Sequence, residues 1–245
     1  MSPGPSSDQA ASARARRWQV LSVMVLLLAV AGGLALALGA FRSKPVGTLS
    51  ANGIRGERET TSLLRGVPYD GLRLGRADAP ATIRVFADLH CPICRAHFTG
   101  SEQRDIVDRL VRPGRAKLEL RLLATLSPNS AVGRTAVERL ALGGGEPWRL
   151  ATMLFYNQGA EGGAWISPDL LRRIGEASPG LRGVSTTPDG RTRRLEAETE
   201  ALRRRYDVGG TPTYVVTRAG AAGYDKVRDR VFVDVARELE RKVSP

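Results

Sequence analysis

The sequence is poor in the residue types that build most metal and nucleophile sites. Of its 245 residues, two are cysteine and two are histidine, and all four lie between positions 90 and 97. A Ser-His-Asp arrangement therefore has no histidine away from the cysteines to serve as its base. No third cysteine exists to act as an internal relay. Any redox chemistry of Cys91 and Cys94 must exchange electrons with a separate protein.

Lysine and aromatic residues are also scarce. The net charge of +12 comes mainly from arginine, since the chain has few lysines and 5% aromatic residues. A basic chain raises nucleic acid or anionic lipid as a partner. The arginines are scattered, however, and no run interleaves them with aromatic residues as a nucleic-acid-binding face would. We therefore expect a solvated arginine-rich surface and no nucleic-acid partner.

The N-terminus consists of a polar tail and one long uncharged run. Residues 1–17 are rich in proline, serine and alanine, which predicts a disordered tail. Residues 18–41 carry no charge, and a helix of that length spans about 36 Å, enough for a hydrocarbon core of about 30 Å. A cleavable signal peptide, cut near Ala37-Leu38-Gly39, is the alternative, but its apolar region is usually roughly 7 to 15 residues. We expect an uncleaved, single-pass signal anchor in the cell membrane.

The part of the chain after this span is divided into a linker and a domain. Basic residues flank the span on both sides, so orientation rests on the tendency of long domains to cross the membrane largely regardless of charge. The domain is therefore expected outside the cytoplasm. Residues 42–70 lack clear periodicity and predict a flexible linker. The folded domain is expected over 71–245.

Within the domain, hydrophobic patterning predicts strands and helices in alternation. Apolar runs between breakers predict strands at 81–87, 117–123, 213–217 and 224–227. Helical periodicity follows Cys94 and returns at 131–142, 147–156, 168–177, 192–206 and 231–242. No internal repeat is visible. This order of elements predicts an α/β fold.

The run Cys91-Pro92-Ile93-Cys94 lies where a predicted strand leads into a helix. A cysteine at a helix N-terminus faces unpaired N–H groups and the positive end of the helix dipole, which stabilise a thiolate. Pro92 suits the first helical position, where no N–H is needed. Cys94 lies within the first turn, close enough for a disulfide. We expect Cys91 to attack a substrate and Cys94 to resolve the mixed disulfide.

A second motif, Gly210-Thr211-Pro212-Thr213, stands directly before a predicted strand. Together the two motifs resemble the DsbA-like family of the thioredoxin superfamily. In that family an apolar strand leads into Phe-x-Asp-x-x-Cys-Pro-x-Cys, and a Gly-Thr-Pro-Thr loop with a cis-proline faces the active site. The residues that match the first motif are Phe86, Asp88, Cys91, Pro92 and Cys94. The resemblance covers roughly residues 71–245.

The resemblance implies a thioredoxin-like fold with a helical insertion at about 127–177, preceded here by one transmembrane helix. It implies a thiol–disulfide oxidoreductase whose clients are proteins with cysteine thiols and whose membrane partner is a quinone-linked reoxidase. We expect no cofactor. The expected catalytic residues are Cys91, Cys94 and Pro212, with a cis bond before Pro212. Substrate contacts are expected at Thr211, Pro92 and Ile93.

Ile93 bears on the direction of the reaction. Strongly oxidising relatives often carry histidine between the cysteines, where it favours the reduced thiolate. Isoleucine offers neither a hydrogen bond nor a charge. We therefore expect a reduction potential between the values of about −270 mV for thioredoxin and about −120 mV for a strong oxidase, on the oxidase side.

Three residues near the cysteines have alternative roles. Asp88 is either a proton relay for Cys94 or a strand-end residue that caps the helix. His90 is a candidate for thiolate tuning, and His97 is expected to be an exposed surface residue.

Two other functions compete with the redox interpretation. His90, Cys91, Cys94 and His97 form a compact cluster that suits a membrane-tethered metal-binding or copper-delivery protein. Structural zinc needs four tetrahedral ligands, usually two from each of two segments, so we favour redox chemistry and expect no bound metal. A substrate-binding adaptor with purely structural cysteines is the third alternative.

Overall fold

The computed structural model describes Met24 and residues 47–228 and 234–243. Residues Met1–Pro45 form a unit separate from Val46–Pro245, and Met24, which is helical, is its one described residue. The expected tail at 1–17 and nearly all of the expected membrane span at 18–41 lie outside the described residues. Among the helices of the described ranges, none combines the length and apolar character needed to cross a membrane.

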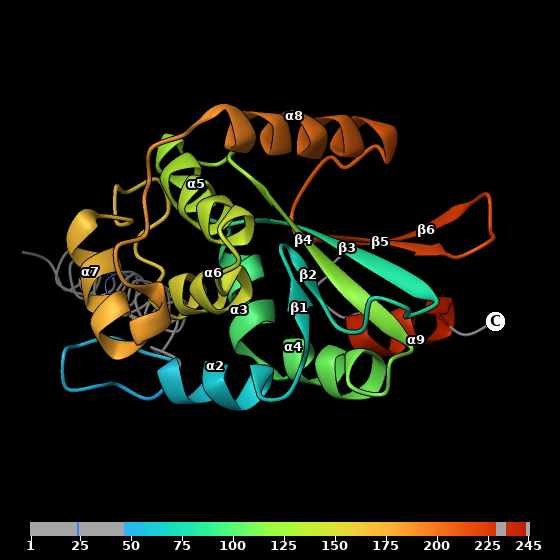
Figure 1. Cartoon of the computed structure of the whole chain (residues 1–245), viewed down its shortest axis with the longest axis horizontal. Coiled ribbons are helices and arrows are strands. Elements are labelled where there is room, and N and C mark those ends of the chain that lie inside the picture. The colour runs from blue at the N-terminus through green and yellow to red at the C-terminus, as the bar shows by residue number, and fades with distance from the viewer. Residues whose placement is uncertain (1–23, 25–46, 229–233, 244–245) are drawn as a thin grey trace, which may run out of the picture. The chain divides into compact units, whose positions relative to one another are not determined.

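Over the described ranges, one sheet with the strand order β1-β2-β4-β3-β5-β6 organises the domain (Figure 1). Its central strands β3 and β4 are parallel, and the other neighbours are antiparallel. The parallel pair holds eight residues in register, from Ala81 opposite Ala116 to Asp88 opposite Leu123. The strands are β1 (Tyr69–Asp70), β2 (Arg73–Leu74), β3 (Ala81–Asp88), β4 (Ala116–Leu123), β5 (Thr213–Arg218) and β6 (Tyr224–Arg228).

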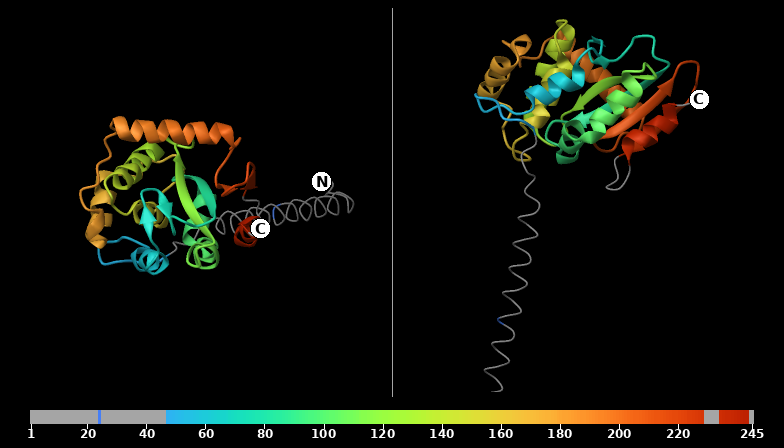
Figure 2. Two further views of the ribbon diagram at one scale, coloured as in Figure 1. Left: turned by 45° about the vertical axis from the view of Figure 1, so that its right-hand side comes forward. Right: turned by 90° about the horizontal axis from the view of Figure 1, so that it is seen from below.

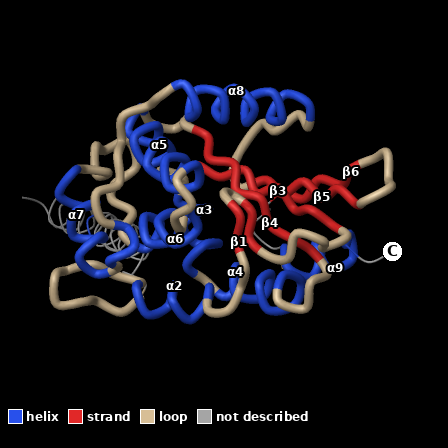
Figure 3. The backbone as a smooth tube through the Cα atoms, in the orientation of Figure 1, coloured by secondary structure: helices blue, strands red, loops and turns tan. Residues whose placement is uncertain are grey.

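Helices cover both faces of the sheet and gather beside it (Figure 3). They are α2 (Glu57–Leu64), α3 (Pro92–Thr99), α4 (Ser101–Ile106), which continues into a π-helical turn (Val107–Val111), α5 (Pro128–Leu142), α6 (Pro147–Tyr156), α7 (Pro168–Ala177), α8 (Gly190–Arg205) and α9 (Val235–Val243), with a 3-10 turn at Pro179–Leu181. The helices α5, α6 and α7 stand between β4 and α8 in the chain, where the helical insertion is expected.

The central strand β3 is apolar along one face, and Phe86 is the apolar residue of the other face. Ile83 and Val85 are fully buried in the large core, which α3, α4 and α9 also line. Phe86 faces the opposite side and packs in a smaller cluster with Tyr206 and Val215, where α8 covers the sheet. Figure 2 (left) shows α8, in orange, on the opposite side of the sheet from the green α4.

Side-chain caps explain why two helices begin earlier than their periodicity predicts. Helix α5 begins at 128 rather than 131, because Ser127 accepts a hydrogen bond from Asn129 N at 3.1 Å and Pro128 fills the first helical position. Helix α8 begins at 190 rather than 192, because Asp189 and Thr192 form a capping box.

The expectation of a flexible linker up to residue 70 is corrected for residues 47–70. Ile54 is fully buried in the core, and Arg55 exchanges backbone hydrogen bonds with the Asn157 side chain, each 3.0 Å long. Gly56 has a φ of 82°, and a Cβ there would lie 2.1 Å from the Tyr156 ring. This segment therefore packs closely on the end of α6. Its few apolar residues lack periodicity, which is why the sequence pattern misses it.

The packing of this segment predicts a stability effect. Replacing Ile54 with alanine should lower the free energy of unfolding by about 2–5 kcal/mol, because it empties a closed part of the core. Leu49→Ala is the control, since Leu49 is 54% exposed and should cost little. Urea denaturation of the full chain measures both. Equal, small effects would show that residues 47–70 do not belong to the folded domain.

Candidate active site

Cys91 lies at the turn that joins β3 to α3 and is the N-cap residue of α3. Its backbone is extended, with φ −77° and ψ 117°, and Pro92 occupies the first turn of the helix. The Cys91 sulfur accepts a hydrogen bond from the Cys94 N–H at 3.3 Å. The sulfur thus takes the place that a serine or aspartate oxygen takes at an ordinary N-cap. The helix start therefore stabilises negative charge on this sulfur.

The two thiols differ strongly in acidity. The side-chain hydrogen bond with Cys94 lowers the pKa of Cys91; burial opposes this, and the Thr211 side chain and the Cys94 and Ile93 N–H groups lower it further, to about 6. Burial raises the pKa of Cys94 well above its usual value, and the hydrogen bond with Cys91 and its charge add to this. Both cysteines are unpaired thiols in this structure. Near neutral pH, Cys91 is therefore the nucleophile of the pair.

The second motif lies against this sulfur. The Thr211–Pro212 peptide bond is cis, as expected. The Thr211 carbonyl oxygen lies 3.4 Å from Cys91 Sγ, to which it is an acceptor when the thiol is protonated. Pro212 is buried, and Thr213 Oγ1 donates to Gly210 O at 2.7 Å within the same loop. The fold therefore brings together two motifs that are about 120 residues apart in the sequence.

Pro92 and Ile93, the two residues between the cysteines, face solvent. Both side chains are exposed, and Ile93 is 45% exposed. Cys91 is only 5% exposed and Cys94 is fully buried. The exposed side chains next to Cys91 in the motif are therefore apolar. This suits the expected contact of Pro92 and Ile93 with a substrate.

Asp88 is fully buried, and its carboxylate organises the neighbouring loop. Oδ1 accepts from His90 N at 2.9 Å and from Ser130 Oγ at 2.6 Å. Oδ2 accepts from the backbone N–H groups of Thr125 at 2.8 Å and Leu126 at 3.0 Å. These contacts favour the structural role over a proton relay, because both oxygens already accept from groups of the β3–α3 turn, the β4–α5 loop and α5.

Both ring nitrogens of His90 lie within hydrogen-bond distance of other side chains, those of Trp165 and Asn129. The indole N–H of Trp165 can only donate, so His90 Nδ1, 3.2 Å away, must be an acceptor. The Asn129 side-chain N–H donates to Ile166 O, and its Oδ1 accepts from Ile166 N. This fixes the orientation of the amide, so it is Oδ1 that lies 3.3 Å from His90 Nε2. His90 is also not among the groups that lower the pKa of Cys91, and its role in thiolate tuning stays a prediction.

Gln158, just after α6, is a contributor that the sequence pattern does not reveal. Its Nε2 donates to Leu89 O at 2.6 Å and to Cys91 O at 3.1 Å. One side chain from the helical insertion thus holds two carbonyls of the cysteine turn. Trp165 and Asn129 were likewise missed, since none of the three stands in a recognisable motif.

His97 is buried rather than exposed, contrary to expectation. It is 9% exposed, and its Nδ1 lies 3.2 Å from the Tyr214 hydroxyl. The search of the described residues finds no group of three histidine, cysteine, aspartate or glutamate side chains placed to hold a metal ion. With both nitrogens of His90 also engaged, the alternative metal cluster gains no support from the geometry.

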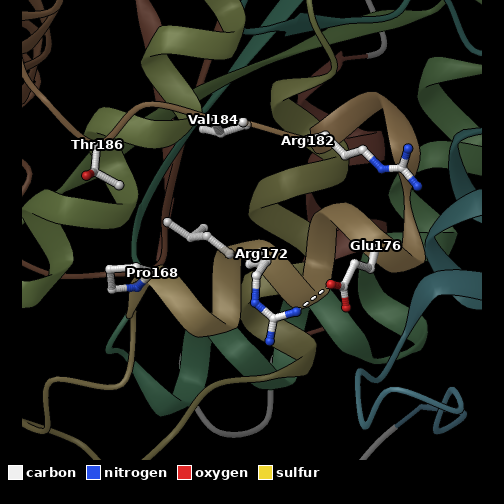
Figure 4. A pocket seen from close by; sticks show the side chains of 8 residues that line it. Pro168, Arg172, Glu176, Arg182, Val184 and Thr186 are labelled. Carbon is white, nitrogen blue, oxygen red and sulfur yellow. Dashed lines mark hydrogen bonds and ion pairs between the residues drawn. The ribbon is translucent and has the colours of Figure 1, made fainter.

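A separate cavity of about 440 Å³ lies between α7 and the segment that follows it (Figure 4). Pro168, Arg182 and Val184 are among its lining residues, and Arg172 pairs with Glu176 at its edge. None of the candidate residues of the redox site lines it. The cavity is therefore not part of the candidate active site.

The sequence and the structure can now be compared with known proteins. Residues 69–218 match the family model described as thioredoxin, which spans more than half of the chain. The chain belongs to the thioredoxin family. No curated protein matches it.

Several solved structures are similar in fold. BdbD from Bacillus subtilis, in its oxidised form, is 18% identical with a TM-score of 0.54, covering 73% of this chain and 96% of that chain. Alpha-DsbA1 from Wolbachia pipientis is 14% identical with a TM-score of 0.54, covering 75% and 97%. DsbA2 from Pseudomonas aeruginosa is 18% identical with a TM-score of 0.50, covering 72% and 97%. The expected thioredoxin-like fold of the DsbA type, with its helical region, is confirmed.

The acidity of Cys91 predicts a pH profile. Alkylation of the reduced protein by iodoacetamide should rise with a midpoint near pH 6, because the thiolate is the reactive form. Cys94 should stay unlabelled over the same range. The same shift contributes to the free energy of unfolding. Because the pKa of Cys91 is lower in the folded than in the unfolded protein, this contribution is present above pH 9 and is lost as the pH falls through 6. Peptide mapping by mass spectrometry checks the assignment; a Cys91 midpoint near 9 would contradict it.

Proposed function

We propose that the protein is an extracytoplasmic thiol–disulfide oxidoreductase that introduces or exchanges disulfide bonds in client proteins. The observation that carries the proposal is the asymmetry of the pair. Cys91 has a pKa of about 6 and lies against the cis-proline loop, while Cys94 is buried with a raised pKa. The family and the fold support the same class of reaction.

The proposed reaction is a two-electron exchange. A client thiolate attacks Cys91 in the Cys91–Cys94 disulfide, and Cys94 leaves as a thiolate. A second client thiolate then attacks the client sulfur of the mixed disulfide and releases the Cys91 thiolate. The client gains a disulfide, and the pair becomes a dithiol. The low pKa of Cys91 makes it a good leaving group and stabilises the reduced form, which drives the exchange in this direction.

Client binding is proposed to use the cis-proline loop. The Thr211 backbone stands beside the Cys91 sulfur, where an extended client segment can add to it as a strand. Pro92 and Ile93, which follow Cys91 in the chain and are exposed, offer apolar contact. These residues and Pro212 are therefore the proposed substrate-binding and catalytic surface.

The proposed location rests on the sequence and on redox chemistry. Disulfides persist outside the cytoplasm and are reduced inside it. A membrane anchor at residues 18–41 would hold the domain close to a quinone-linked membrane protein able to reoxidise the dithiol. The absence of any further cysteine means that this reoxidant must be a separate molecule.

The division of labour between the thiols can be tested by trapping. In the Cys94→Ser variant, the Cys91 thiolate can still attack the disulfide of an oxidised client, but Cys94 is absent to attack Cys91 and release the client, so the mixed disulfide should accumulate. The matched Cys91→Ser variant should trap no client, since Cys94 is fully buried. Non-reducing gels after acid quenching detect the complexes. Trapping by Cys91→Ser alone would reverse the assignment.

The direction of the reaction can be tested by redox equilibrium. Equilibration of the purified full chain with glutathione should give a potential between about −270 and −120 mV, on the oxidase side. Ile93→His should shift it to a less negative value, because histidine favours the thiolate. A wild-type potential as low as that of thioredoxin would identify a reductase instead.

A further inference from the structure

Arg228 places a positive charge beside the cis-proline loop. It ends β6 opposite Thr213, the first residue of β5. Its Nη2 atom lies 3.1 Å from where a Cβ would stand on Gly210 and 3.7 Å from the same position on Gly209. The side chain is exposed and has no hydrogen-bond or ion-pair partner within the part of the chain that the structure describes.

The loop leaves this guanidinium open to a bound peptide. Gly209 and Gly210 carry no side chains, so the guanidinium of Arg228 is the charged group beside these two residues. The exposed residues Pro92 and Ile93, which follow Cys91 in the chain, are uncharged. A client segment lying along the loop therefore meets one apolar region and one positive charge.

The distance along the loop fixes which client residue meets the charge. Cys91 Sγ lies 3.4 Å from Thr211 O, so a client cysteine bonded to Cys91 lies next to Thr211. Gly210 and Gly209, the two glycines beside Arg228 Nη2, stand one and two residues before Thr211, and in an extended client segment side chains two positions apart point to the same face. A client residue two positions from the reactive cysteine therefore points to the same side as that cysteine and comes within reach of Arg228.

We propose that Arg228 is a specificity-determining residue that selects client segments with an acidic residue two positions from the reactive cysteine. The proposal rests on the proposed function and names a substrate class for it. A guanidinium pairs with a carboxylate in a bidentate geometry that no neutral side chain matches. Because the pair is exposed, the discrimination is modest, about three- to fivefold.

Peptide kinetics with the reduced full-length protein, held in an uncharged detergent, test the proposal. Each peptide carries one cysteine as a mixed disulfide with thionitrobenzoate, and Asp, Asn or Lys two positions before or after it. The Cys91 thiolate attacks the peptide sulfur, the peptide–Cys91 disulfide forms, and the thionitrobenzoate thiolate leaves and is measured by absorbance. The quantity compared is the ratio of rates for the Asp and Asn peptides, because comparing this ratio between variants cancels differences in peptide reactivity.

At low ionic strength, Arg228→Gln should lower the Asp/Asn ratio about three- to fivefold for one of the two positions, and Arg228→Glu should favour the Lys peptide. Arg194→Gln, which removes an exposed arginine from α8, is the control with the same change in net charge and should leave the ratio unchanged. An unchanged ratio in Arg228→Gln, or an equal fall in Arg194→Gln, would overturn the proposal.

The Asn peptide separates this inference from the proposed function. If the wild-type protein releases thionitrobenzoate from it no faster than free cysteine does, the proposed function fails. If the wild type and Arg228→Gln react with it equally fast, the variant is folded and active. A difference confined to the charged peptides then isolates the role of Arg228.

Discussion

The hydrogen bond from the Cys94 N–H to the Cys91 sulfur is the interaction on which the site depends. It exists because a strand ends and a helix begins within three residues, with Pro92 in the first turn. The same turn places one sulfur at the positive end of the helix and buries the other within the first turn. The side-chain hydrogen bond with Cys94, helped by the backbone N–H groups of the turn, lowers the pKa of Cys91, and burial raises that of Cys94, so two chemically identical side chains acquire opposite shifts in pKa. Without this turn, the motif would be two ordinary thiols.

The turn is held from several sides, and most of the supports come from the helical insertion. Gln158 binds the carbonyls of Leu89 and Cys91, and the Trp165 indole binds the His90 ring. Asp88 ties the turn to Ser130 at the start of α5. The insertion is thus part of the structure that fixes the Cys91 backbone, in addition to any role in covering clients.

The sequence predicts the elements that carry strong local signals and misses the parts that depend on tertiary contacts. The strands at 81–87 and 213–217 and the helices at 147–156 and 168–177 are found nearly to the residue, because apolar runs mark them and Pro147 and Pro168 mark the helix starts. The cysteine pair and the cis-proline loop are recognisable as motifs. The roles of Gln158 and Ile54 are invisible, since a lone glutamine and a lone isoleucine gain meaning only from what packs on them.

The raised pKa of Cys94 does not prevent it from attacking Cys91 in a mixed disulfide and releasing the client, which is the reverse of the client oxidation, because part of the cause of the raised pKa is lost when Cys91 is bonded to a client. Burial is the largest cause, and the next two are the hydrogen bond and the charge of Cys91. In a mixed disulfide, the Cys91 sulfur carries no negative charge. It is then no longer a thiolate that accepts a hydrogen bond from the Cys94 thiol. Those two contributions are then lost, and Cys94 becomes easier to deprotonate. The pair therefore keeps Cys94 protonated in the resting dithiol and frees it to react once Cys91 is bonded to a client.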